Sequence, residues 1–214
     1  TSIKIGQTAN TTLNLGNQIT TTGDALIGAS GKTNTINIKA TSAFNPDTTA
    51  VIDATGDAVT VAGTLNIALD ANSNVIANDA TITVIESDTT AGTSYATLVG
   101  NGGVAFTDTA MIDLQNNTST TTDLLMKVVY KTDIAGVSGQ NETALSNALT
   151  AATAASDNTT FATLATLTTT QTEDSAEKVQ PDTGAANGAA LAAVGGVNNV
   201  ISGRQASTRV AFNT

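Results

Sequence analysis

The chain has 214 residues, a length typical of one domain, or of one domain with an appendage. Charged residues make up 12% of it, where a globular domain usually carries roughly 25%. The net charge of −10 and the scattering of the eight basic residues argue against nucleic acid or an anionic membrane surface as a partner. With no Cys and no His, the chain lacks disulfides, thiolate nucleophiles, zinc–thiolate sites and the commonest general base.

Threonine is unusually abundant, at 42 positions, and Ala, Asn, Gly and Ser dominate the remainder. β-branched threonine suits exposed strand faces, whereas Asn, Gly and Asp suit tight turns. The composition therefore indicates many short strands with frequent turns. Enzymes that act on polysaccharides need aromatic platforms and clustered carboxylates. Because aromatic residues make up only 3% of the chain, we predict a protein that is not an enzyme and uses no cofactor.

An apolar-x-apolar triplet recurs along the first two thirds of the chain. The triplets are Leu13-Asn-Leu15, Ile36-Asn-Ile38, Val59-Thr-Val61, Ile82-Thr-Val84, Val104-Ala-Phe106 and Met126-Lys-Val128. Alternation with period two is typical of a strand with one buried face. Successive triplets are 23, 23, 23, 22 and 22 residues apart, and a fixed period in this range points to a stacked repeat.

This spacing predicts a mostly β fold, a right-handed parallel β-helix (solenoid) with about 23 residues per coil over residues 1–137. Turn-forming strings such as Asn45-Pro46-Asp47 lie between the triplets. Ile36, Val59 and Ile82 should then lie on neighbouring rungs. A β-sandwich with regularly spaced strands is the alternative.

After Asp133 the pattern becomes helical. Residues 138–181 are predicted as a helical region, with a first helix capped by Asn141 and stopped at Asp157-Asn158. A second short helix should follow around Phe161, and Thr170 with Glu173 forms a capping box for a third. Residues 182–214 carry a narrow apolar stripe among small residues, which predicts one more helix. We expect this helix to be stable only when other protein surrounds it.

Four strings in this region resemble the end of the passenger domain in type V autotransporters, above all the rickettsial outer-membrane surface antigens. They are Asn141-Glu-Thr-Ala-Leu-Ser-Asn-Ala-Leu149, Leu164-Ala-Thr-Leu167, Val179-Gln-Pro-Asp-Thr-Gly-Ala185 and Val200-Ile-Ser-Gly-Arg-Gln-Ala-Ser-Thr-Arg209. Val179 and Gln205 stand where the family often has Leu.

The resemblance implies that residues 1–137 are the membrane-proximal end of a passenger, which folds first and templates the coils behind it. Residues 182–214 would be the linker helix leading into the chain's own C-terminal translocator barrel, and the sequence given would be a fragment or a processed form. The implied location is the bacterial cell surface or outer membrane, or the medium after cleavage.

Asn198-Asn199 is a candidate passenger-cleavage site, because one autotransporter branch is cut at an Asn pair inside the barrel helix. The alternative is that this asparagine pair has no special role and simply lies on the polar surface of a helix in an Asn-rich chain. The spacing of the aspartates at 24, 57, 70, 79, 88 and 108 does not match the nonapeptide repeat of calcium-binding β-rolls. We therefore interpret them as solvated turn residues and predict no metal site.

Three roles remain open. The first is a non-catalytic, surface-exposed stalk and autochaperone segment of an autotransporter surface antigen. The second is an adhesin module for a receptor on a host or neighbouring cell, which predicts an exposed apolar or aromatic patch on one face, with Phe44, Tyr95 and Phe106 as the candidates. The third is an S-layer-like subunit that self-associates through uncapped solenoid ends.

Overall fold

The computed structural model describes residues 2–90, 94–137 and 140–173, and these residues belong to one compact unit. Eleven strands and three helices are assigned in this part of the chain. The N-terminal strands are β1 (Ile3–Ile5), β2 (Thr11–Leu15), β3 (Ile19–Thr20), β4 (Ala25–Ile27), β5 (Thr33–Ile38), β6 (Ile52–Val61), β7 (Thr64–Leu69) and β8 (Thr81–Thr90). There follow α1 (Tyr95–Gly100), β9 (Val104–Phe106), β10 (Ile112–Asn116), β11 (Leu124–Tyr130), α2 (Gln140–Ala154) and α3 (Asn158–Ala165).

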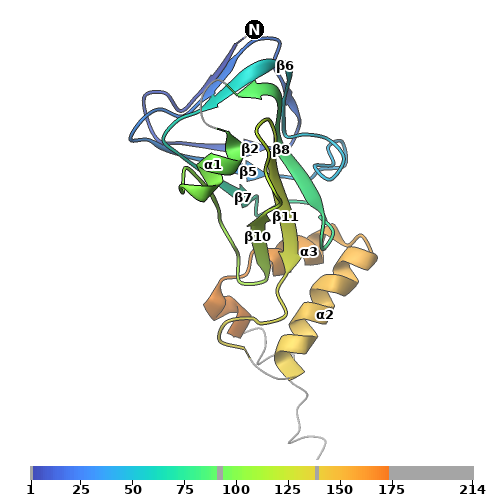
Figure 1. The fold of residues 1–214 in the computed structure, drawn as a ribbon. Coiled ribbons are helices and arrows are strands. Elements are labelled where there is room, and N and C mark those ends of the chain that lie inside the picture. The colour runs from blue at the N-terminus through green and yellow to red at the C-terminus, as the bar shows by residue number, and fades with distance from the viewer. Residues whose placement is uncertain (1, 91–93, 138–139, 174–214) are drawn as a thin grey trace, which may run out of the picture. The chain divides into compact units, whose positions relative to one another are not determined.

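The strands form two sheets (Figure 1). A seven-stranded sheet has the order β1-β4-β6-β8-β11-β10, with β3 also paired to β6. A four-stranded sheet has the order β2-β5-β7-β9, and all its strands are parallel. The prediction of a mostly β fold is therefore confirmed, and parallel pairing dominates it.

The predicted solenoid of constant 23-residue coils is not what the structure shows. Ile36 pairs with Leu13 and with Ile67 in the four-stranded sheet. Val59 lies in the other sheet beside Ala25. Ile82, in that same sheet, lies opposite Met126 in an antiparallel pair. Ile36, Val59 and Ile82 are thus not on neighbouring rungs, and that prediction is wrong.

The steps between paired strands lengthen along the chain. Leu13, Ile36, Ile67 and Phe106 are aligned across the four-stranded sheet, at separations of 23, 31 and 39 residues. The loop that contains the buried Phe44 lengthens the second step, and α1 lengthens the third. Only the first step keeps the predicted period.

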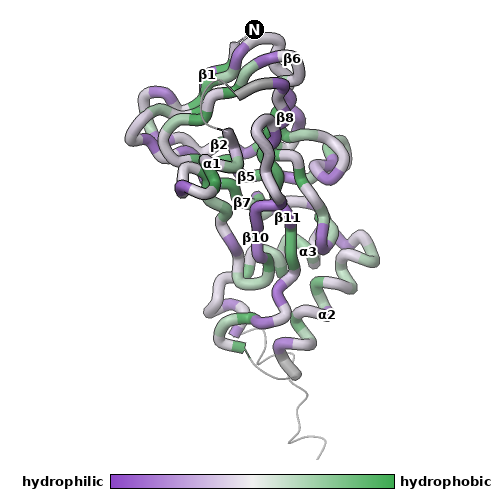
Figure 2. The backbone as a smooth tube through the Cα atoms, in the orientation of Figure 1, coloured by the Kyte–Doolittle hydropathy of each residue, from purple (hydrophilic) through white to green (hydrophobic). Residues whose placement is uncertain are grey.

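Alternating side chains supply the core. Strand β11 alternates buried and half-buried positions along its whole length, and Ile38, Ile67, Ile82 and Val128 are fully buried. Figure 2 shows these hydrophobic stretches along the strands, with hydrophilic residues gathered mainly in the connecting loops. The apolar positions of both sheets form one continuous cluster.

Asparagine side chains join neighbouring strands. The side-chain amide of Asn37 donates to Asn14 Oδ1 at 2.8 Å. The buried Asn34 accepts a hydrogen bond from the backbone N–H of Thr11 at 3.1 Å. These contacts stabilise the first 23-residue step and give the abundant asparagines a structural role.

Individual helices in this part of the chain have bounds that differ by a few residues from those predicted. Helix α2 begins at Gln140, so Asn141 lies inside it. Helix α2 ends at Ala154, and the Asp157 N–H donates back to the Ala152 carbonyl oxygen at 2.8 Å. Asp157 is also the N-cap of α3, since its carboxylate accepts the Thr160 N–H at 3.1 Å. Beyond the three labelled helices, residues 169–173 are also helical, where the third helix of this region was predicted. The capping box lies two residues earlier than predicted: the Thr168 hydroxyl accepts the Gln171 N–H, and the Gln171 side chain accepts the Thr168 N–H.

Helices α2 and α3 pack against the β-structure. Phe161 of α3 is fully buried, and its ring centroid lies 6.3 Å from that of Tyr130 in β11. The Tyr130 hydroxyl donates to the carbonyl oxygen of Ile76 at 2.5 Å and lies 2.7 Å from Thr153 Oγ1. The same tyrosine therefore holds a strand, a loop and a helix together.

Candidate functional site

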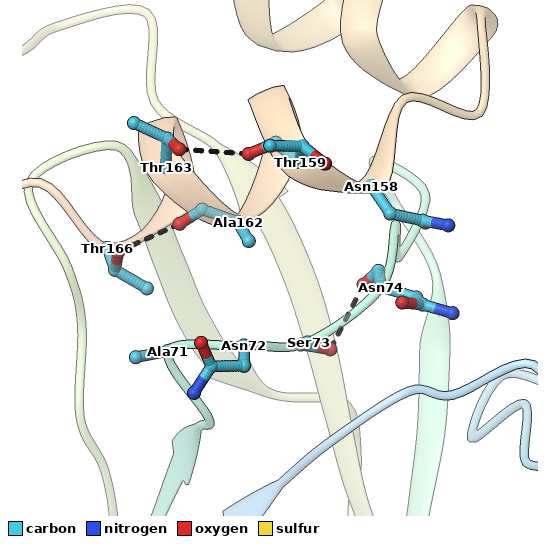
Figure 3. Close-up of a pocket in the computed structure, with 9 residues that line it drawn as sticks. All are labelled: Ala71, Asn72, Ser73, Asn74, Asn158, Thr159, Ala162, Thr163 and Thr166. Atoms are coloured by element: carbon cyan, nitrogen blue, oxygen red, sulfur yellow. Dashed lines mark hydrogen bonds between the residues drawn. The ribbon is translucent and has the colours of Figure 1, made fainter.

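A polar groove lies between helix α3 and the loop that follows β7 (Figure 3). It has a volume of about 460 Å³ and is lined by the nine residues labelled in Figure 3, none of which is charged. On the loop side these are residues 71–74, and on the helix side Asn158, Thr159, Ala162, Thr163 and Thr166.

The loop side of the groove is held by a dense set of hydrogen bonds. Ser73 donates its backbone N–H to the carbonyl oxygen of Asp70, and its hydroxyl accepts the N–H of Ala40 at 2.9 Å. Asn74 donates its N–H to the Ala40 carbonyl, and Asn72 donates its N–H to Asp70 Oδ1 at 2.8 Å. Because these backbone groups are satisfied, the loop has a fixed shape.

The helix side is tied to the same loop. The Val75 N–H donates to Asn158 Oδ1 at 2.9 Å, at the first turn of α3. Thr159, Thr163 and Thr166 follow at the spacing of one helix face. The groove is therefore built from two segments whose separation is set by a direct hydrogen bond.

A second hollow, of about 360 Å³, adjoins the groove and shares Asn74 and Asn158 with it. Phe44 and Asp47 contribute to its wall. Burial raises the pKa of the Asp47 carboxyl, and a backbone hydrogen bond from Ala77 partly opposes that effect. The Asp47 Oδ1 atom is inaccessible to solvent and has no hydrogen-bond partner among the described residues.

A third hollow, of about 550 Å³, lies beside Lys131. The Lys131 ammonium donates to the Thr109 carbonyl oxygen at 2.8 Å and pairs with Asp108 at 3.5 Å. The Asp108 carboxylate also accepts the Leu114 N–H at 2.9 Å. These charges are therefore used to hold neighbouring segments together.

The predicted cleavage pair, Asn198 and Asn199, lies outside the described residues. The aromatic patch proposed for adhesion is wrong for two of its three members: Phe44 and Tyr95 are buried, and Phe106 is half-buried. Burial raises the pKa of the Tyr95 hydroxyl to about 12, which fits a core residue.

Several of the turn aspartates act as hydrogen-bond acceptors or ion-pair partners. Asp24 Oδ1 accepts the Ala58 N–H at 3.2 Å, and Asp79 forms a 2.6 Å ion pair with Lys127. Within residues 2–90, 94–137 and 140–173, no three acidic residues lie close enough together to hold a metal ion.

Sequence reasoning did not predict the groove, because its two sides lie some ninety positions apart in the chain. The side chains that build it, Ser73 and Asn158, are ordinary members of a Ser- and Asn-rich sequence. No periodicity or motif distinguishes them.

The chain matches no protein-family model, no curated protein sequence and no solved structure. In the part of the chain that the structure describes, no helix has the length and hydrophobicity needed to span a bilayer. A function must therefore be argued from the residues themselves and from the sequence resemblance.

Proposed function

We propose that this chain is a non-catalytic, surface-exposed stalk and autochaperone segment of an autotransporter surface antigen. It acts at the bacterial cell surface or outer membrane, or in the medium after cleavage. The observation that carries the proposal is the difference between the two ends of the stacked strands.

The N-terminal end of the stack is open. Strands β1, β2 and β3 each have a hydrogen-bonded neighbour on one side only within the described residues. The core-facing side chains of this layer, Ile3, Ile5, Leu13 and Ile19, are half-buried and pack on the buried core beneath them. A further layer of strands would cover these side chains and pair these edges.

At the other end the parallel order stops, because β11 and β10 pair antiparallel; the outermost strands β10 and β9 also have a single hydrogen-bonded neighbour each among the described residues. Strand β11 pairs with β8, and β10 pairs with β11 at the edge. Helices α2 and α3 add Leu145, Leu149 and Phe161 to the same core. Because antiparallel strands and helices cap this end, we expect further parallel strands to add at the N-terminal layer only, as in a stalk. The capped end is also suited to fold first.

The charge distribution fits growth at the open end. Residues 2–23 contain a single charged side chain, Lys4, in a chain whose net charge is −10. Another layer of strands could therefore approach this end without strong electrostatic repulsion. The edge strand β2 contains neither proline nor a charged residue, the usual features that protect an exposed edge.

The polar groove beside α3 favours a second role, that of an adhesin module, for the same surface location. The open β2 edge would equally serve an array-forming subunit. The stalk explains both ends of the stack, whereas the other two roles each explain one feature.

The proposal can be tested with single cysteines, because the chain has none of its own. Cells that produce the full-length protein would carry Ala154→Cys, exposed on α2, or Leu13→Cys, on the open layer. A membrane-impermeant maleimide should label Ala154→Cys on intact cells. It should label Leu13→Cys in the isolated chain but not in the full-length protein. Loss of Ala154→Cys labelling on intact cells would refute the surface location, and equal labelling of Leu13→Cys in both would refute the stalk.

A further inference from the structure

The loop side of the groove between α3 and the loop after β7 carries two asparagine carboxamides, Asn72 and Asn74. The side-chain carboxamides of Asn72 and Asn74 make no hydrogen bond to any other described residue. Each can therefore give two N–H donors and one carbonyl acceptor to a ligand. In Figure 3 the carbonyl oxygen of Asn72 points from the loop toward the helix.

The opposite side offers acceptors. The Thr163 hydroxyl donates its proton to the Thr159 carbonyl oxygen at 2.9 Å, and the Thr166 hydroxyl donates to the Ala162 carbonyl oxygen at 2.8 Å. Since each hydroxyl has one proton, only the oxygen lone pairs of Thr163 and Thr166 remain for a ligand. The groove thus presents carboxamides, which both donate and accept, from the loop and acceptor oxygens of Thr163 and Thr166 from the helix.

The carboxylates nearest to the groove already accept hydrogen bonds from other groups of the protein. Asp70 accepts the Asn72 N–H, and both Asp157 oxygens accept hydrogen bonds from Thr160. No charged side chain lines the groove, so an ionic ligand would lose its hydration without gaining a counter-charge there. The ligand best matched to the groove is uncharged and carries groups that both donate and accept.

We propose that this groove binds an uncharged glycan, whose ring hydroxyls each donate and accept a hydrogen bond. The volume of about 460 Å³ falls within the range of small-molecule sites, and the loop is already fixed by its own hydrogen bonds. This proposal does not depend on the stalk role, because the groove contains no residue of the open layer formed by β1, β2 and β3.

The test is a titration of the 214-residue chain, labelled with ¹⁵N, with three uncharged glycans: maltotriose, N,N′,N″-triacetylchitotriose and lactose. Glucosamine and glucuronate serve as charged comparators. At least one uncharged glycan should give saturable shifts at the backbone amides of Asn72, Asn74 and Asn158. Saturable binding of only the charged sugars, shifts confined to other regions, or no saturable shift with any glycan would overturn the proposal.

Two variants locate the binding. Ala162→Phe places a ring in the groove and should weaken binding at least tenfold, whereas Ala154→Phe, exposed on α2, should leave it unchanged. If Ala162→Phe does not fold, the double variant Asn72→Ala, Asn74→Ala removes the free carboxamides without touching the core and should abolish the shifts. Binding by the double variant equal to that of the unaltered chain would refute the assignment.

Discussion

The contact between Phe161 and Tyr130 tests whether the helices stabilise the β-structure. Phe161 is fully buried, so Phe161→Ala removes a whole aromatic side chain from the core. At about 25 cal/mol per Å², the roughly 150 Å² that such a side chain hides corresponds to about 4 kcal/mol. We expect the free energy of unfolding to fall by about 3–5 kcal/mol, the usual cost of this substitution. That is a large share of the roughly 5–15 kcal/mol that stabilises a domain.

Urea unfolding should be followed by far-UV circular dichroism and by the fluorescence of the two tyrosines, Tyr95 and Tyr130. Tyr130 lies next to Phe161, whereas Tyr95 belongs to α1. Both signals should change in one transition, shifted to lower urea in the variant. Phe106→Ala, at a half-buried position on β9, is the control and should cost clearly less. A loss below about 1 kcal/mol for Phe161→Ala, the level of an ordinary substitution, would refute the packing described for α3.

Three further predictions concern turns and carboxyl groups. Gly31→Ala should cost about 1–2 kcal/mol, because its φ of +71° is unfavourable but its Cβ would meet no atom within 4 Å. Gly63→Ala should cost more in the same urea assay, since at a similar φ of +74° its Cβ would lie 2.3 Å from a backbone oxygen; equal losses would contradict this. The pKa of Asp47 is raised by burial, so the native chain should lose stability as pH rises from 3.8 through that raised pKa, and Asp47→Asn should abolish this loss. Hydrogen bonds from Thr160 lower the pKa of the Asp157 carboxyl, so the destabilisation caused by Asp157→Ala should be present above pH 3.8 and vanish as pH falls through the lowered pKa. Thermal melts across pH would check the Asp47 and Asp157 predictions, and pH slopes of the same sign for the two residues would contradict them.

The strand pattern was predictable where local alternation decides it. The triplets at Leu13, Ile36 and Met126 do lie in strands with one buried face. Alternation fixes which side chains face the core, but it does not fix which strand is the neighbour or in which direction it runs. For that reason Met126 was expected in a further parallel coil, although β11 pairs antiparallel to β8.

The helices and the groove show a second limit. The short apolar run Leu98-Val99 lies in the six-residue helix α1, although a run of this length fits a strand equally well. The groove depends on Asn158 meeting the N–H of Val75, a contact between residues 83 positions apart. Only the packing of α3 on the sheets brings them together, and no local feature of the sequence encodes it.

Hydrogen exchange measured by mass spectrometry on the isolated chain can show whether the strand stack is open at its N-terminal layer and capped by antiparallel strands and helices at the other end. We expect β1 and β2 to exchange fastest and β8 and β11 to be the best protected strands, with intermediate rates for β4 and β5. Equal protection of β2 and β11, or slower exchange in β1 and β2 than in β8, would contradict it.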